Sequence, residues 1–420
     1  MLTDLEKLTP EAARSAAWQS IWTFPSIIFA ALVIAWGAES AQFLVSQAFA
    51  LTILALIQTL PEFAVEGVIA WNAGQSPTLM NIGLMTANFT GAIRLLVGLG
   101  WPLIFATTVI FNLKRSRRLS VAGITLEGEH AVEVSGMFLA SIYAFIIVLK
   151  GSLNIVDSAI LAAMYVVYVV FLLKLPPRDA EKIEELEFIP RYILTRKRLT
   201  RNILIWICFI CGGTGIMLVA HPFLESALGL SFVLGVPAYM MIQWLAPFLS
   251  EFPEKISAFY WAKSIVKAPM SLMNMVSSGI AELTLLIAII PIIFCISLGS
   301  VSAIDFDWSH RAEILLTATQ AVLGVIILSK MSFKWFEAVG LFFLWASQIY
   351  YQFRFSQVHL PFAVDSLVQS GLYEISHIVI LERYIAVYWI WAMAELIIIL
   401  MIYRKIPLLP SLRKVFSAHA

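Results

Sequence analysis

Two apolar stretches, ALIQTLPEFAVEG (residues 55–67) and WLAPFLSEFPEKIS (residues 244–257), decide the fold because each contains a Pro-Glu pair. These pairs are Pro61-Glu62 and Pro253-Glu254. A proline interrupts a helix, and a carboxylate within hydrocarbon costs about 2.5–3.5 kcal/mol even on the lenient insertion scale. The chain contains a helix-breaking proline and a carboxylate in an apolar segment twice, at matching places. We therefore expect these glutamates to have a function.

The surrounding composition is that of a polytopic membrane protein. Of the 420 residues, 60% are hydrophobic and only 13% are charged, and the mean hydropathy is +0.87. Soluble domains carry about 25% charged residues. The expected surroundings are therefore a lipid bilayer, and the net charge of +1 indicates no nucleic-acid partner.

The predicted fold class is an all-α membrane protein with about eleven transmembrane helices, because apolar windows of bilayer-crossing length recur along the chain. Four windows are too long for one straight crossing and must tilt, break or extend past the bilayer. The predicted spans are 19–37, 41–72, 80–112, 132–150, 153–174, 203–221, 228–261, 269–299, 312–330, 334–353 and 384–403.

Basic residues in the short connections predict the orientation. With eleven spans, the Lys- and Arg-rich loops fall on one side, and the loop with Asp305 and Asp307 falls on the other. The sequence therefore predicts a multi-pass protein of the cell or inner membrane, with its N-terminus outside and its C-terminus cytoplasmic. The basic loops contain Lys114 to Arg118, Arg191 to Arg201, Lys263 and Lys267, Lys330 and Lys334, and Arg404 to Lys414.

Aligning the two Pro-Glu pairs reveals an internal repeat. The next span then matches Asn88 to Asn274, and the last span of each half begins with an acidic residue, Asp157 or Glu337, which we expect to fix the span end. Each half therefore contains five spans in the same order. Because the number of spans in the repeat is odd, the two halves must insert with opposite topology. The predicted organisation is an N-terminal polar segment (1–18), a first inverted five-helix repeat (19–174), a cytoplasmic linker (175–202), a second repeat (203–353), and an extra C-terminal helix with a tail (354–420).

The polar groups near these breaks suit hard cations. Broken helices free backbone carbonyls, and carboxylate, amide and hydroxyl oxygens are ligands of Ca2+ or Na+, whereas His and Cys are absent from the motifs. The carboxylates outnumber the nearby bases, so a cation or protons must neutralise them in low dielectric. Because both would neutralise the same groups, they would compete, which is a basis for exchange. The carboxylates are Glu62, Glu66, Glu251, Glu254 and Glu282, and the nearby bases are Arg94 and Lys255.

Arg94 has two interpretations. It could pair with Glu66 or Glu62 as a fixed internal counter-ion of the site, or it could form a structural ion pair away from the pathway. Lys255 could extend its side chain to the cytoplasmic interface instead of joining the site.

These motifs make the chain resemble the cation/Ca2+ exchanger superfamily, which includes the sodium/calcium and calcium/proton exchangers. That resemblance implies ten core helices, two ion gates beside a central site, and alternating access by a sliding pair of gating helices. It implies that Glu62 and Glu254 are the central ligands of Ca2+ or Na+, that Thr59 and Ser250 precede them, and that Asn88, Asn274, Ser278 and Glu282 belong to the following helices.

The first half departs from the family pattern. The second half has Ser278 and Glu282 on the helix after its Pro-Glu pair. The first half has Ala92 and Leu96 at the matching positions, and their side chains cannot coordinate an ion. Glu66 and Glu251 are carboxylates additional to the family motif. We therefore expect the second repeat to supply most of the ligands of the bound ion.

The function predicted from the sequence is secondary active cation antiport, most simply Ca2+ exchanged for Na+ or H+. Two alternatives remain open: a monovalent Na+/H+ exchanger on the same scaffold, and a membrane assembly partner that does not transport. The chain has no P-loop signature and no catalytic motif, so neither an ATP-driven pump nor an enzyme is predicted. No cofactor is expected beyond the transported ions, Ca2+, Na+ or H+.

Overall fold

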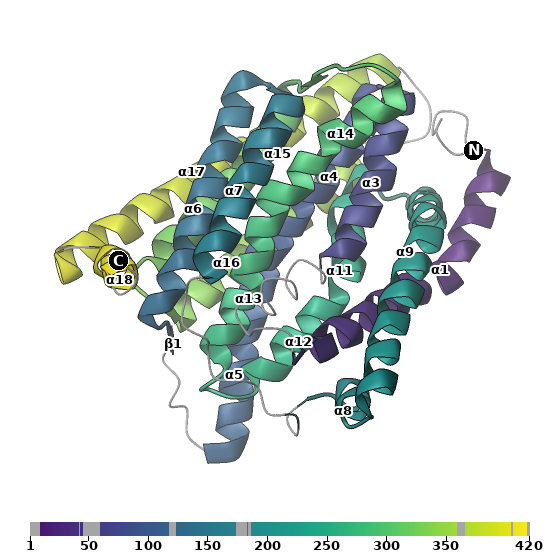
Figure 1. Cartoon of the computed structure of the whole chain (residues 1–420). Helices are drawn as coiled ribbons and strands as arrows, with labels where there is room; N and C mark the ends of the chain where they lie inside the picture. Colours follow the sequence, from purple (N-terminus) through teal and green to yellow (C-terminus); the bar gives the residue numbers. More distant parts are fainter. Residues whose placement is uncertain are drawn as a thin grey trace.

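The computed structural model describes residues 9–41, 43–44, 59–116, 123–173, 183, 186–358, 366–404 and 406–417. These residues form a bundle of long helices with two small antiparallel sheets (Figure 1). The first half contains α1 (Pro10–Ala41), α3 (Leu60–Gln75), α4 (Leu79–Leu95), the π-helical turn η2 (Leu96–Gly100), α5 (Trp101–Ser116), β1 (Gly123–Thr125), the 3-10 turn η3 (Gly128–His130), α6 (Ala131–Lys150), β2 (Ser152–Leu153) and α7 (Ile155–Leu173).

The second half follows a similar order after the short helix α8. It contains α8 (Phe188–Leu194), α9 (Arg198–Leu234), α10 (Ala238–Met240), the π-helical turn η5 (Met241–Leu245), α11 (Ala246–Ser250), α12 (Phe252–Ala262), α13 (Ala268–Ala281), the π-helical turn η6 (Glu282–Leu286), α14 (Ile287–Leu298), β3 (Ile304–Asp305), α15 (Trp308–Leu328), β4 (Ser332–Lys334) and α16 (Trp335–Val358). The remaining helices are α17 (Ser366–Tyr403) and α18 (Leu408–Ser417).

The part of the chain that the structure describes has 8 helices long and apolar enough to cross a membrane. They coincide with eight predicted spans, so the all-α membrane class is confirmed. The other three predicted spans (41–72, 228–261 and 334–353) include α3, the broken α10–α12 segment and α16. The count of eleven crossings therefore stays a prediction.

One predicted boundary is wrong. The spans 203–221 and 228–261 were expected to be separated near residue 222, but α9 continues through Pro222 to Leu234. The reason is packing against α1 along its length, where small residues allow the two helices to approach closely. A Cβ added to Gly229 would lie 2.7 Å from the carbonyl oxygen of Ala13, and the Thr23 and Ser226 hydroxyls are hydrogen-bonded at 2.7 Å.

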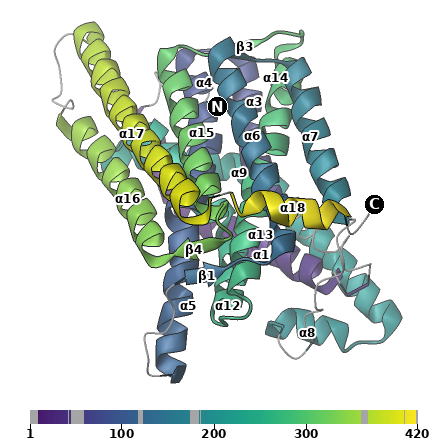
Figure 2. The same ribbon diagram turned by 90° about the vertical axis from the view of Figure 1, so that its left-hand side faces the viewer.

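The two halves repeat each other closely in local geometry. The π-turns η2 and η6 begin at Leu96 and Glu282, positions that align when Asn88 is matched to Asn274. Both sheets join one half to the other, because β1 pairs with β4 and β2 pairs with β3. Figure 2 shows β3 at one end of the bundle and β1 with β4 toward the other. The related strands of the two halves therefore lie at opposite ends.

Equivalent ion pairs hold the starts of α7 and α16. Lys150 pairs with Asp157, and Lys330 pairs with Glu337, seven residues later in each case. Each carboxylate also accepts a backbone N–H three residues before it, from Asn154 at 2.7 Å and from Lys334 at 2.6 Å. Asp157 and Glu337 therefore stabilise helix starts, as the sequence indicated.

Candidate ion-binding site

Both Pro-Glu pairs begin a helix inside the bundle. Pro61 lies in the first turn of α3 and Pro253 in the first turn of α12, where a missing N–H breaks no helical hydrogen bond. Glu62 and Glu254 are the acidic residues of these first turns, at the positive end of the helix dipole.

The first glutamate is held by side chains from both halves of the chain. Asn88 of α4 donates one amide hydrogen bond to Glu62 Oε1 and another to Glu66 Oε2, both at 2.7 Å. Ser250, the last residue of α11, donates a hydrogen bond to Glu62 Oε2. Four of the predicted site residues therefore form one connected network between α3, α4 and α11.

The second glutamate lacks such partners. Glu254 is fully buried, and neither of its carboxylate oxygens has a hydrogen bond within the described structure, although the Ser278 hydroxyl lies nearby. Glu282, at the start of η6, is equally buried with both oxygens likewise unpartnered. It lies within electrostatic range of Glu62, Glu251 and Glu254. These unpartnered oxygens are the strongest indication that a cation or protons bind here.

Further polar atoms lie buried near these carboxylates. Among the described residues, one oxygen of Glu66, the amide oxygen of Asn88 and the amide nitrogen of Asn274 are also buried without a hydrogen-bond partner. Thr59 is buried immediately before α3. The structure therefore brings Glu62, Glu66, Asn88 and Ser250 into direct contact. It buries Glu251, Glu254, Ser278 and Glu282 in the adjoining α11–α14 segment, where Asn274 is half-buried, whereas Thr59 precedes α3.

Lys255 belongs to this group rather than to the membrane interface. Its side chain is only 3% exposed and forms an ion pair with Glu251, one turn earlier. The Lys255 charge acts on Glu62, Glu254 and Glu282 as well. Of the two possibilities for Lys255, the extension to the cytoplasmic interface is wrong, because the side chain is buried and its ammonium pairs with Glu251.

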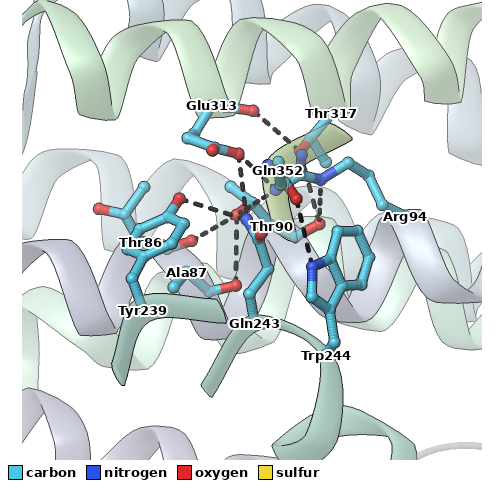
Figure 3. A network of polar contacts seen from close by, with 10 residues as sticks. All are labelled: Thr86, Ala87, Thr90, Arg94, Tyr239, Gln243, Trp244, Glu313, Thr317 and Gln352. Carbon is cyan, nitrogen blue, oxygen red and sulfur yellow. Dashed lines mark hydrogen bonds and ion pairs between the residues drawn. The ribbon is translucent and has the colours of Figure 1, made fainter. Parts of the chain in front are cut away.

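Arg94 does not pair with either of the carboxylates that the counter-ion interpretation named. Its guanidinium pairs with Glu313 of α15, and not with Glu62 or Glu66 (Figure 3). Gln243 of η5 donates a hydrogen bond to the same Glu313 oxygen at 3.1 Å, and the Trp244 ring lies 5.2 Å from the Arg94 guanidinium carbon. This second network connects α4, η5 and α15 and compensates the Arg94 charge locally.

Sequence reasoning missed Glu313 and Gln243. The available signal for Glu313 was a recurring His-x-x-Glu pattern, which places His130 and Glu133 at the start of α6 and His310 and Glu313 at the start of α15. Gln243 carried no such signal, because its neighbours in the sequence are apolar.

The described residues contain no group of three or more His, Cys, Asp or Glu side chains arranged to hold a metal ion. The candidate site instead mixes carboxylates with amide and hydroxyl oxygens.

Comparison with known proteins now identifies the family. A model of the family described as sodium/calcium exchanger protein matches residues 15–174 and 204–354. The chain belongs to the sodium/calcium exchanger family. It is therefore a membrane cation/calcium exchanger by family and not an enzyme.

Solved structures agree with this family assignment. The crystal structure of the H+/Ca2+ exchanger CAX is 28% identical, covers 99% of this chain and 93% of its own, and superposes with a TM-score of 0.79. The sodium-calcium exchanger NCX_Mj, soaked with Na+ and Sr2+, is 14% identical, covers 81% of this chain and 99% of its own, and gives a TM-score of 0.52. The second likeness concerns the fold alone. No curated protein sequence matches the chain.

Proposed function

We propose that this exchanger is a secondary active antiporter that moves Ca2+ in one direction and protons in the other, at a site formed by Glu62, Glu254 and Glu282. The observation that carries the proposal is the complete burial of Glu254 and Glu282 with unpartnered oxygens. Ionised carboxylates in such surroundings need a compensating positive charge. Either a divalent cation or protons could supply it, and binding of one would release the other.

The donor set favours Ca2+. This ion takes six to eight oxygen ligands from carboxylates, amides and carbonyls in flexible geometry. Carboxylate, amide and hydroxyl oxygens meet here, including those of Asn88 and Ser250, and Pro253 has no N–H to donate to the carbonyl of Leu249. Ligands come from both halves, but Ser278 and Glu282 have no first-half counterpart, so the second half would supply most of them.

Protons are the proposed counter-ion for two reasons. The number of carboxylates exceeds what one Ca2+ and one ammonium neutralise, so protonation is needed to balance the charge when the ion leaves. The CAX structure, similar over almost the whole chain, is that of a protein named as an H+/Ca2+ exchanger. Na+ as counter-ion, with or without Ca2+, remains the alternative that the transport assay below distinguishes.

Eleven crossings in two inverted repeats, with the extra helix α17, are the proposed membrane topology. The contacts support a single basic end: the Lys263 ammonium lies 5.5 Å from the Phe111 ring, and β1 pairs with β4, beside Lys334. The ends of α5, α8 and α12 gather at the lower end in Figure 1. This end is proposed to be cytoplasmic, which places the N-terminus outside.

Flux into proteoliposomes tests the function. With an imposed pH gradient, radioactive Ca2+ should accumulate against its concentration gradient, and Glu254→Gln should abolish uptake. Glu225→Gln is the matched control, because Glu225 lies on α9 and faces His221 rather than the site. Uptake driven only by a Na+ gradient would favour sodium coupling. The absence of Ca2+ flux under any gradient, for the wild type as for Glu254→Gln, would overturn the proposal.

A further inference from the structure

Lys255 is an unusual group to find at a cation site. It lies one turn into α12, and its ammonium pairs with Glu251 at the junction between α11 and α12. Both side chains are out of solvent, with exposed fractions of 3% and 1%. A buried base that faces several carboxylates does the electrostatic work of a bound monovalent cation without ever dissociating.

Arg94 does not share this role. Because its guanidinium is paired with Glu313, its charge is already compensated outside the site. Lys255 is then the basic side chain that acts on four of the site carboxylates in the described structure, Glu62, Glu251, Glu254 and Glu282. The site therefore contains one permanent positive charge. The remaining negative charge must be compensated by ions that bind and dissociate.

An ammonium and Na+ carry the same charge, but the ammonium of Lys255 is tethered. It donates directly to Glu251, and its covalent link gives it a high effective concentration that free Na+ must overcome. A Na+ ion at Glu251 would have to displace the ammonium from Oε2, or lie close to it at Oε1, which has no hydrogen-bond partner, and be repelled by it. A divalent ion need not use Glu251, because Glu254 and Glu282 still offer unpartnered oxygens.

We propose that Lys255 is a built-in monovalent cation that occupies Glu251 and makes ion exchange by this protein insensitive to Na+. Lys255 thus determines which ions can use the site. The inference rests on the proposed Ca2+ binding at Glu62, Glu254 and Glu282, and it assigns the choice of counter-ion to one residue.

The test compares Na+ with choline in measurements of Ca2+ affinity by calorimetry on the purified full chain. In the wild type, replacing choline by Na+ should leave the Kd for Ca2+ unchanged. In Lys255→Met the vacated Glu251 accepts Na+, and Na+ should raise the Kd for Ca2+ about tenfold, the factor that corresponds to 1.4 kcal/mol. Lys255→Gln, which keeps hydrogen-bond donors without the charge, should behave alike and serves if the Met variant does not fold.

Three further variants separate the tethered charge from other effects. Lys255→Arg keeps a cation beside Glu251 and should show no Na+ effect. The double variant Glu251→Gln/Lys255→Met removes both charges and should also show none, because the vacated carboxylate is gone. Lys263→Met, the same substitution at the exposed end of α12, is the matched control and should equal the wild type.

Equal Na+ sensitivity in the wild type and in Lys255→Gln, or none in either uncharged variant, would overturn the inference. Binding of radioactive Na+ to Lys255→Gln provides a readout that does not depend on Ca2+. If the wild type neither binds nor transports Ca2+, the proposed function fails. Na+ binding gained on loss of Lys255 would still support the role of the tethered ammonium.

Discussion

The guanidinium of Arg94 on α4 and the carboxylate of Glu313 on α15 form an ion pair that joins the two halves of the chain, with exposed fractions of 0% and 1%. Gln243 donates to the same carboxylate and so ties the helix preceding the second Pro-Glu pair to this contact. The pair therefore positions the α10–α11 segment, and through it Ser250, relative to α4.

Arg94→Met should destabilise the protein strongly. Removing one partner of a buried pair leaves the other charge uncompensated, which costs roughly 3–5 kcal/mol. Thermal unfolding in detergent should show a large drop in Tm for Arg94→Met. The double variant Arg94→Met/Glu313→Met should recover much of it, since no lone charge remains. Loss of Ca2+ affinity with an unchanged Tm would instead place Arg94 in the site.

Asn88→Leu should weaken Ca2+ binding without unfolding the protein. Asn88 holds the carboxylates of Glu62 and Glu66 together through two hydrogen bonds, and two carboxylates without this bridge should repel each other and separate. We expect about a tenfold rise in the Kd for Ca2+, measured by calorimetry. Asn81→Ala, on the same helix but hydrogen-bonded to Ser76 at the helix start, should leave the Kd unchanged. An equal effect of both substitutions would contradict this role.

Lys330 and Lys150 should differ in their contributions to stability, although they occupy equivalent places. Lys330 is 3% exposed and pairs with both Glu337 and Glu395, whereas the Lys150 side chain is 33% exposed and pairs with Asp157. Lys330→Met leaves two buried carboxylates and should cost roughly 3–5 kcal/mol. Lys150→Met should cost about 1 kcal/mol or less, because solvent screens that pair. Comparable Tm losses for the two variants would refute the difference.

Gly91→Ala should disrupt the packing of α4 against η5. A Cβ at this position would lie 1.8 Å from the carbonyl oxygen of Gln243, so the backbones would have to separate. The expected result is a lower Tm together with lost Ca2+ uptake. Gly213→Ala on α9 is the control, since nothing lies within 4 Å of its added Cβ. It should stabilise the helix by about 0.5–1 kcal/mol.

Much of the fold was predictable because the bilayer imposes a simple rule on composition. Eight predicted spans coincide with eight apolar helices, and both Pro-Glu pairs begin helices as expected. The boundary between the predicted spans 203–221 and 228–261 was wrong for a tertiary reason, since α9 continues to Leu234 where α1 packs beside it. The lengths of apolar windows do not show where a neighbouring helix allows a helix to continue.

The sequence by itself determined the membrane class, the repeated Pro-Glu pairs and the identity of the candidate carboxylates. These follow from local hydropathy and from residue types that are costly in hydrocarbon. Only the tertiary structure decided which charges meet. Arg94 lies six residues from Asn88 yet pairs with Glu313, more than two hundred residues away, while Lys255 turns inward to Glu251. The strength of an ion pair depends on the distance between the charges and on their burial. For residues on separate helices, the spacing along the chain determines neither quantity.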